Sequence, residues 1–125
     1  MNILENLKYT EEHEWVRVEG NIAYVGITDF AQSELGEIVF VELEQLGEPL
    51  DKGEIFGSIE AVKTVSDLFM PLTGKIIEIN EQLEDAPELV NSDAFGEGWM
   101  IKIEISDASE LTELMDASAY KALVD

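Results

Sequence analysis

The chain contains no cysteine, and this absence removes several kinds of chemistry at once. Without a thiol there is no disulfide, no thiolate metal site and no cysteine nucleophile in the polypeptide. His13 is the single histidine, so a multi-histidine metal site and a two-histidine proton relay are excluded as well. We therefore expect no catalytic residue and no metal site, because most self-contained enzyme chemistries are hard to build from this composition.

Cations and long apolar runs are also scarce. Seven Lys and Arg stand against 28 Asp and Glu, which gives a formal net charge of −21 over 125 residues. Binding to nucleic acid or to an anionic membrane depends on cationic side chains, so neither is an expected partner. No run reaches the roughly 18 apolar residues of a membrane span. The first eight residues lack the basic start and apolar stretch of a secretory signal, and we expect a cytoplasmic monomer.

What the chain does contain is a series of short β-rich segments separated by glycine and proline. Residues 14–19 and 22–27 flank Gly20-Asn21, a pattern that predicts a β-hairpin. Thr28 and Gly36 are typical start and stop residues for a short helix between them. Further strands are expected over 37–43, 54–62, 68–71, 75–80 and 99–105, with turns at 47–49 and 51–53.

The C-terminal segment changes character. Ser106-Asp107 can cap one helix, and Ser118 can start a second, shorter one. Regularly spaced short strands with only peripheral helices predict an all-β fold, a flattened β-barrel sandwich of two small sheets. We expect a single domain over 1–125, with its core over about 14–105 and a helical tail over 106–125.

A weak internal repeat supports two β units of similar build. A shift of 38 positions superposes Gly36 on Gly74 and Ile38 on Ile76. Chance matching among common strand residues is the alternative interpretation. If the repeat is real, Lys63 lies at the tip of a hairpin that joins the two halves.

Lys63 is the residue in this segment whose side chain is best suited to covalent modification. An amine at the exposed tip of a rigid sheet suits an enzyme that attaches an acyl group, and the acylated lysine becomes a long flexible arm. A solvated hairpin lysine without further function is the alternative interpretation. Local physics alone favours the second.

The sequence resembles a known family, the H proteins of the glycine cleavage system. The segment around the lysine, Glu60-Ala61-Val62-Lys63-Thr64-Val65-Ser66-Asp67, matches the lipoyl-attachment motif of that family. Ala61 stands where the family usually has serine, and Ala94 where it often has proline, but neither change removes a group that the chemistry requires. The other matching segments are residues 9–16, 25–32, 35–43, 71–74, 87–91 and 98–103.

The resemblance implies a carrier and not an enzyme. In the family, the lysine that matches Lys63 is joined to lipoic acid by an amide bond. The cofactor accepts an aminomethyl group from the pyridoxal-phosphate-dependent P protein, which decarboxylates glycine. The T protein passes the one-carbon unit to tetrahydrofolate, and the flavoprotein L protein reoxidises the dithiol. These three proteins and a lipoate-attaching enzyme are the expected partners.

Three carboxylates are candidates for holding the loaded arm. The amine of the aminomethyl group is cationic near neutral pH, and a cleft lined by carboxylates can hold it away from water. By resemblance the arm folds back near the N-terminal segment, which makes Glu14, Asp67 and Glu12 the candidates, with position 12 the more variable. The alternative is that these side chains belong to a solvated acidic face.

Four other functions are alternatives. A lipoyl domain of a 2-oxoacid dehydrogenase would bring a flexible linker, and a biotin carrier would place methionines where Val62 and Thr64 stand. A lipoyl donor for other complexes and an unmodified acidic adaptor are the remaining alternatives. The acidic surplus fits either adaptation to high internal salt or docking on basic partner surfaces. His13 is expected to be structural, and Trp15 and Trp99 to serve packing.

Overall fold

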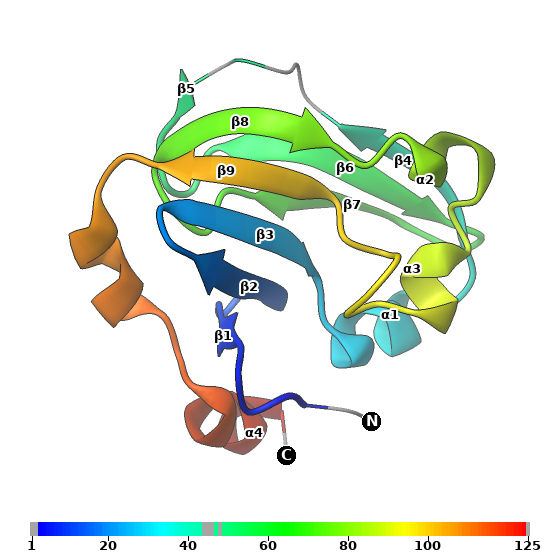
Figure 1. Cartoon of the computed structure of the whole chain (residues 1–125). Coiled ribbons are helices and arrows are strands. Elements are labelled where there is room, and N and C mark those ends of the chain that lie inside the picture. The colour runs from blue at the N-terminus through cyan, green and yellow to red at the C-terminus, as the bar shows by residue number, and fades with distance from the viewer. Residues whose placement is uncertain (1–2, 44–46, 48, 125) are drawn as a thin grey trace.

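The structure is a computed structural model that describes residues 3–43, 47 and 49–124, and its strands form two antiparallel sheets (Figure 1). The six-stranded sheet has the order β1-β2-β3-β9-β8-β5, and the three-stranded sheet has the order β4-β6-β7. Their bounds are β1 Lys8–Tyr9, β2 Glu14–Glu19, β3 Ile22–Ile27, β4 Ile38–Leu43, β5 Pro49–Leu50, β6 Ile55–Ala61, β7 Val65–Phe69, β8 Gly74–Ile79 and β9 Ile101–Ile105.

The helices are short and lie around the edges of the sheets (Figure 1). They are α1 Asp29–Leu35, α2 Gln82–Asp85, α3 Leu89–Ser92, the 3₁₀-helix η1 Ala108–Glu113 and α4 Ala117–Val124. Two stacked antiparallel sheets with peripheral helices confirm the predicted all-β barrel-sandwich fold class.

The first hairpin follows from its sequence pattern. β2 and β3 pair with Glu19 opposite Ile22, so Gly20-Asn21 is the turn, as predicted. Gly20 has φ 65°, a backbone conformation that glycine adopts at little cost. Val16 and Val25 face each other in the core, whereas the neighbouring pair Arg17 and Tyr24 is only half-buried, as strand alternation requires.

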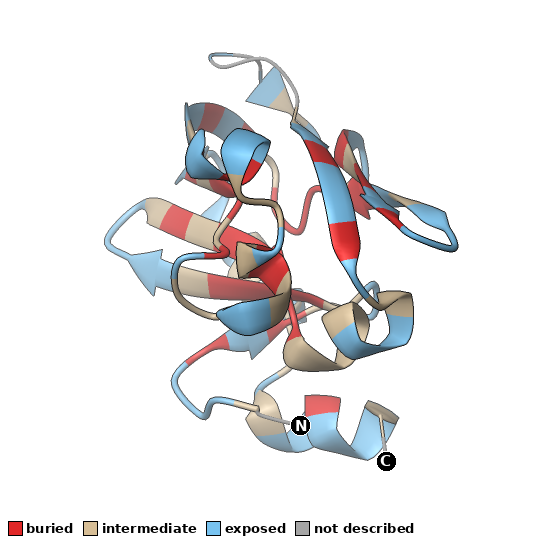
Figure 2. Cartoon of the chain, turned by 90° about the vertical axis from the view of Figure 1, so that its right-hand side faces the viewer, coloured by how far each residue is buried: buried red, intermediate tan, exposed pale blue. Residues whose placement is uncertain are grey.

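The main core draws its members from both sheets, and buried residues recur along the strands of each (Figure 2). Each fully buried aliphatic or aromatic side chain there contributes about 1.5–3 kcal/mol to stability. The largest fully buried members include Phe56, Ile38, Ile59, Leu72, Ile76 and Ile101.

A second, smaller core ties the C-terminal tail to the body. Its buried members are Leu7, Tyr9, Trp15 and Tyr120, of which Tyr120 comes from α4. The tail helix therefore packs on the N-terminal segment and β1 through a hydrophobic cluster of its own (Figure 1).

The two sheets share one irregularity that supports the internal repeat. The pairing of β4 with β6 shifts register between Ile38 and Phe40, and the pairing of β8 with β9 shifts between Ile76 and Glu78. These positions are the same ones that the 38-residue shift superposes. The sheets are unequal in size, however, so the expectation of two sheets of similar build is wrong.

Several predicted bounds need correction. The strand expected at 68–71 is β7, Val65–Phe69, because its pairing with β6 extends up to the hairpin tip at Glu60 and Val65. The first tail helix is a 3₁₀-helix, and α2, α3, β1 and β5 were not expected. The predicted turn at 47–49 includes Glu48, which lies outside the described residues, and Pro49 begins β5.

Candidate functional site

Lys63 lies at the exposed tip of the β6–β7 hairpin, as predicted. The Ala61 amide donates to the Thr64 carbonyl over 2.8 Å and closes the turn. The Val62 amide donates to the Glu37 carbonyl over 3.1 Å, which fixes the tip to the residue before β4. Lys63 and its neighbours on both sides are exposed. The backbone of the tip is thus anchored while the amine remains accessible.

The stem of Lys63 lies against the end of α1. A Cβ placed on Gly36 would lie 3.6 Å from Lys63 Cε, an ordinary van der Waals distance. Gly36 is the C-cap of α1, with φ 82° and ψ −156°, a region that is essentially restricted to glycine. The predicted cap at Thr28 is also confirmed, because its side chain accepts a hydrogen bond from the Ala31 amide.

Asn91 on α3 holds this region together and was assigned no role in the sequence. Its Oδ1 accepts from the Ile38 amide over 2.9 Å, and its Nδ2 donates to Gln32 Oε1 and to the Gly36 carbonyl. One side chain therefore joins α1, α3 and β4 beneath the lysine. The available signal was its position in a segment that matches the family.

A cavity of about 280 Å³, here called the smaller cavity, opens along α1 and β7. Its lining includes Phe30 and Glu34 from α1 and Asp67 from β7. Glu12 and His13, from the loop before β2, complete the side nearest the N-terminal segment. Because α1 ends at the glycine that contacts Lys63, this cavity lies on the lysine's side of the molecule.

A second cavity of about 510 Å³, here called the larger cavity, lies beyond it. It is lined by Glu12 and Glu14 together with Phe69 at the end of β7. Glu12 lines both cavities, whereas Asp67 lines the smaller one and Glu14 the larger one. The three predicted carboxylates therefore do not share a single cleft; they follow one another along two cavities that meet at Glu12.

Glu14 is a buried carboxyl group with specific partners. Its Oε1 accepts from Thr10 Oγ1 over 2.7 Å, and its Oε2 accepts from the Phe69 amide over 3.3 Å. Only 2% of the residue is exposed. Burial raises the pKa of Glu14 to about 7, and the two hydrogen bonds act against that rise. Asp67, by contrast, is exposed.

His13 is part of the wall of the smaller cavity. It has φ 68°, uncommon for a residue with a side chain, and its ring packs on Phe30 with centroids 4.9 Å apart. Burial lowers the pKa of His13, while the nearby Glu12 and Glu34 carboxylates act in the opposite direction. Its Nδ1 lies 2.9 Å from the Tyr120 hydroxyl. These contacts agree with the structural role expected for it.

The two tryptophans serve packing, as predicted. Trp15 is fully buried, and its Nε1 donates to the Ala94 carbonyl over 2.8 Å. Trp99 is half-buried and packs edge-on against Tyr24.

Two kinds of feature are absent from the described part of the chain. Within it, no three or more His, Asp and Glu side chains are grouped so that they could hold a metal ion. No helix among the same residues has the length and apolar character needed to cross a membrane.

Comparison with known proteins places the chain in a family. Residues 7–125 match the family model described as glycine cleavage H-protein. The glycine cleavage system H protein of Bacteroides thetaiotaomicron is 63% identical over 125 residues, which cover 100% of this chain and 99% of that protein. That of Brevibacillus brevis is 60% identical over 124 residues, covering 99% and 98% respectively.

Comparison with a solved structure gives the same family. The crystal structure of a glycine cleavage system H protein from Mycobacterium marinum superposes with a TM-score of 0.88 at 36% identity, covering 96% of this chain and 97% of that one. Sequence and fold thus point the same way over nearly the whole length. The chain belongs to the glycine cleavage H-protein family, the lipoyl-carrying and non-catalytic component of the glycine cleavage system.

Proposed function

We propose that Lys63 carries lipoic acid through an amide bond, and that residues 1–125 act as one lipoyl-binding domain in the cytoplasm. The observation that carries this proposal is the exposed Lys63 amine on an anchored hairpin, next to a cavity on the same side. When bound, lipoic acid supplies a dithiolane that accepts the aminomethyl group derived from glycine and, later, reducing equivalents.

The residues around Lys63 fit such a group. An attaching enzyme needs an amine that projects from the surface, and the anchored backbone lets the tip enter an active site without unfolding the sheet. Val62 and Val65 are 72% and 64% exposed on either side, so apolar contact surface is available beside the amine. The family relationship supports an attaching enzyme and the P, T and L proteins as partners of a monomeric carrier.

The carboxylates suggest a path for the loaded arm. From the hairpin tip, β7 leads first to Asp67 and then to Phe69, whose amide binds Glu14. Residues two apart on a strand are separated by about 7 Å, so the path is continuous. Asp67 lies in the smaller cavity, Glu12 lies where the two cavities meet, and Glu14 lies in the larger cavity. A cationic amine moving along this path meets one carboxylate after another.

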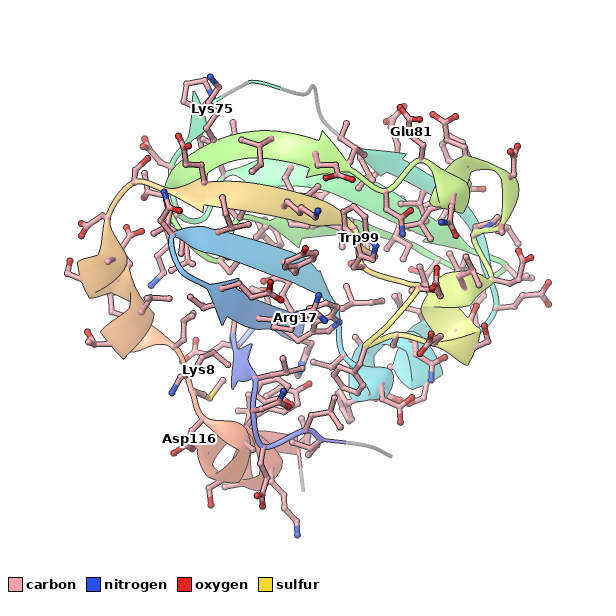
Figure 3. The ribbon with its side chains drawn as sticks, in the orientation of Figure 1. Lys8, Arg17, Lys75, Glu81, Trp99 and Asp116 are labelled. Atoms are coloured by element: carbon pink, nitrogen blue, oxygen red, sulfur yellow. The ribbon has the colours of Figure 1, made fainter. Side chains whose placement is uncertain are left out.

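Substitution of Lys63 tests the attachment. Lys63→Ala and Lys63→Arg should both fold and both lack lipoate, because a guanidinium with a pKa above about 12 is not acylated. Intact mass after expression with active lipoylation, and glycine–bicarbonate exchange with P protein, are the measurements. Lys75→Arg, at an exposed lysine on β8 (Figure 3), is the matched control and should be modified normally.

Two outcomes would overturn the assignment of lipoate to Lys63, and a third would change the function. Lipoate found on the Lys63→Arg variant would place the site elsewhere. A wild-type mass equal to that of the bare chain, from cells that lipoylate other proteins, would favour the acidic adaptor. Modification without exchange activity would favour a lipoyl donor for other complexes.

Neutralising the carboxylates tests the docking path. In Glu12→Gln and Asp67→Asn variants, the loaded protein should decay up to about fivefold faster, since an exposed ion pair contributes about 0–1 kcal/mol. Glu14→Gln should act in the same direction, with a somewhat larger effect because Glu14 is buried and hydrogen-bonded. Lipoylation should be unchanged. The measurement is release of ammonia and formaldehyde from the isolated loaded protein at fixed pH and salt. Glu84→Gln, at an exposed position on α2, is the control. Equal decay in all variants would mean that these carboxylates do not hold the loaded arm.

A further inference from the structure

The C-terminal helix α4 inserts one aromatic side chain, Tyr120, beneath the N-terminal segment. The residue is fully buried, and its ring stacks on Tyr9 with centroids 4.6 Å apart and planes within 8°. The stacking fixes the ring and therefore the direction of its hydroxyl. That hydroxyl lies 2.7 Å from Thr28 Oγ1 and 2.9 Å from His13 Nδ1. Both partners belong to the part of the chain that surrounds the smaller cavity.

Each partner controls one element of the cavity wall. Thr28 is the N-cap of α1, and its side chain accepts from the Ala31 amide. His13 packs on Phe30, the next wall residue. Ala31, Phe30 and His13 all line the smaller cavity, whereas Tyr120 does not. Tyr120 therefore acts on the wall from behind, through two hydrogen bonds.

One arrangement of protons satisfies all three groups in a chain that runs from Thr28 through Tyr120 to His13. Thr28 is fully buried, its Oγ1 already accepts from the Ala31 amide, and its hydroxyl proton can be donated to Tyr120 Oη, which lies 2.7 Å away. If Thr28 donates to Tyr120, the Tyr120 proton is directed at His13 Nδ1, which must then accept. In that arrangement the imidazole proton lies on Nε2 and the ring is neutral.

A neutral His13 suits a cavity that receives a cation. The charged groups around the ring are Glu12 beside it in the chain, Glu34 on α1 and Asp67 on β7, all lining the same cavity. An imidazolium among them would cancel part of their charge and repel an incoming ammonium group. Holding Nδ1 as an acceptor keeps the cavity's charge negative.

We propose that Tyr120 is a positioning residue for the smaller cavity. Its hydroxyl links Thr28 to His13 and so holds α1 and the neutral imidazole in place in the cavity wall. A fixed wall slows loss of the aminomethyl group from the loaded arm. The proposal rests on the proposed function for its consequence, but its geometry is independent of lipoylation. It gives the C-terminal helix a task at the site, although that helix lies outside the two sheets.

The first experiment observes His13 directly in the unmodified protein. Because the chain has one histidine, ¹⁵N–¹H spectra of its ring give one set of signals. In the wild type above the His13 pKa, Nδ1 should have the shift of an unprotonated nitrogen and Nε2 that of a protonated one. In Tyr120→Phe, which keeps the ring stack and removes the hydroxyl, the two shifts should move towards each other as the tautomers mix.

The second experiment follows the loaded arm. Tyr120→Phe should be lipoylated at the wild-type rate but lose its aminomethyl group about 2- to 5-fold faster, an effect of the size that one net hydrogen bond produces. The matched control is Asp116→Ala. Asp116 lies at the start of α4 (Figure 3), and its Oδ1 caps the helix by accepting from the Ala119 amide. This variant removes a side-chain cap from the same helix but keeps the stacked Tyr120 ring and its hydroxyl, and it should leave both the His13 signals and the decay rate unchanged.

The outcomes separate this proposal from the proposed function. An unchanged His13 tautomer in Tyr120→Phe, or equal acceleration of decay in Asp116→Ala, would overturn the positioning role while lipoate remains on Lys63. A wild type that never acquires lipoate would overturn the proposed function, and the His13 spectra would still report on the hydrogen bonds. Thr28→Val removes the first donor and should mix the tautomers too, so the test does not depend on one variant folding.

Discussion

Glu14 differs from most other carboxylates in its environment, because its side chain points into the protein. Most of the 28 acidic residues have water around them, whereas Glu14 turns inward between Thr10 and Phe69. Removing a carboxylate from water disfavours its charged form, and two hydrogen bonds recover only part of that loss. The group therefore changes charge near neutral pH, in the range where the carrier is proposed to receive and release a cation.

The raised pKa of Glu14 predicts a specific pH dependence of stability. Between the unfolded pKa of 4.5 and the folded pKa of about 7, the folded state binds more protons, so the free energy of unfolding falls as pH rises. Below pH 4.5 this contribution is fully present, and above about 7 it is lost. Glu14→Gln cannot titrate and should gain stability relative to the wild type, by on the order of 1–3 kcal/mol, between pH 4.5 and 8.

Urea unfolding of both proteins at several pH values checks this. The difference between the two curves is the quantity of interest, because the other carboxylates titrate equally in both. A difference that stays constant from pH 4.5 to 8 would mean that the Glu14 pKa is unshifted.

At the scale of elements, local signals were sufficient where one or two residues determine the geometry. Gly20-Asn21 determined the first turn, and Thr28 with Gly36 determined both ends of α1. In both cases the physical cause lies within a few residues of its effect. The hairpin at Lys63 was expected instead from the internal repeat, and β6 and β7 pair on either side of it up to Glu60 and Val65.

Features that depend on distant pairing could not be predicted in this way. The helices α2 and α3 have four residues each, too short for a periodic pattern. The contact between His13 and Tyr120 joins residues 107 positions apart. The separation of Asp67 and Glu14 into two cavities depends on the path of β7 between them. Sequence reasoning therefore identified the carboxylates but not their arrangement.

Gly36 allows a prediction about the end of α1. Its φ of 82° and ψ of −156° strain any residue with a Cβ, so Gly36→Ala should lower the free energy of unfolding by about 1–3 kcal/mol. Lysine contact is not the cause, because the added Cβ would sit 3.6 Å from Lys63 Cε. Gly20→Ala is the control: its φ is 65° and nothing lies within 4 Å, so the loss there should be smaller.

Denaturant unfolding of the two variants measures the difference. Equal losses would mean that Gly36 requires only an ordinary left-handed turn residue.

At the scale of the whole molecule, charge is the dominant feature. The three ion pairs among the described residues are Arg17 with Glu19, Lys52 with Glu113 and Lys102 with Glu78, and each has at least one half-exposed side chain. Arg17 and Lys102 both lie over the Tyr24 ring, so two of the seven cations are gathered in one place. Most of the surface is left with unbalanced negative charge, which repels itself.

This imbalance predicts that salt stabilises the protein. Raising ionic strength from about 0.01 M to 0.15 M shortens the Debye length from about 30 Å to about 8 Å and screens the long-range repulsion. The few exposed ion pairs lose little, since each contributes about 0–1 kcal/mol. A net gain of about 1 kcal/mol would raise Tm by roughly 3–5 °C for a chain of this size. Calorimetry in KCl is the suitable measurement, because sulfate would also strengthen apolar burial. A Tm that falls as KCl is added would mean that attractive pairs, and not repulsion among the 28 carboxylates, control the electrostatic part of stability.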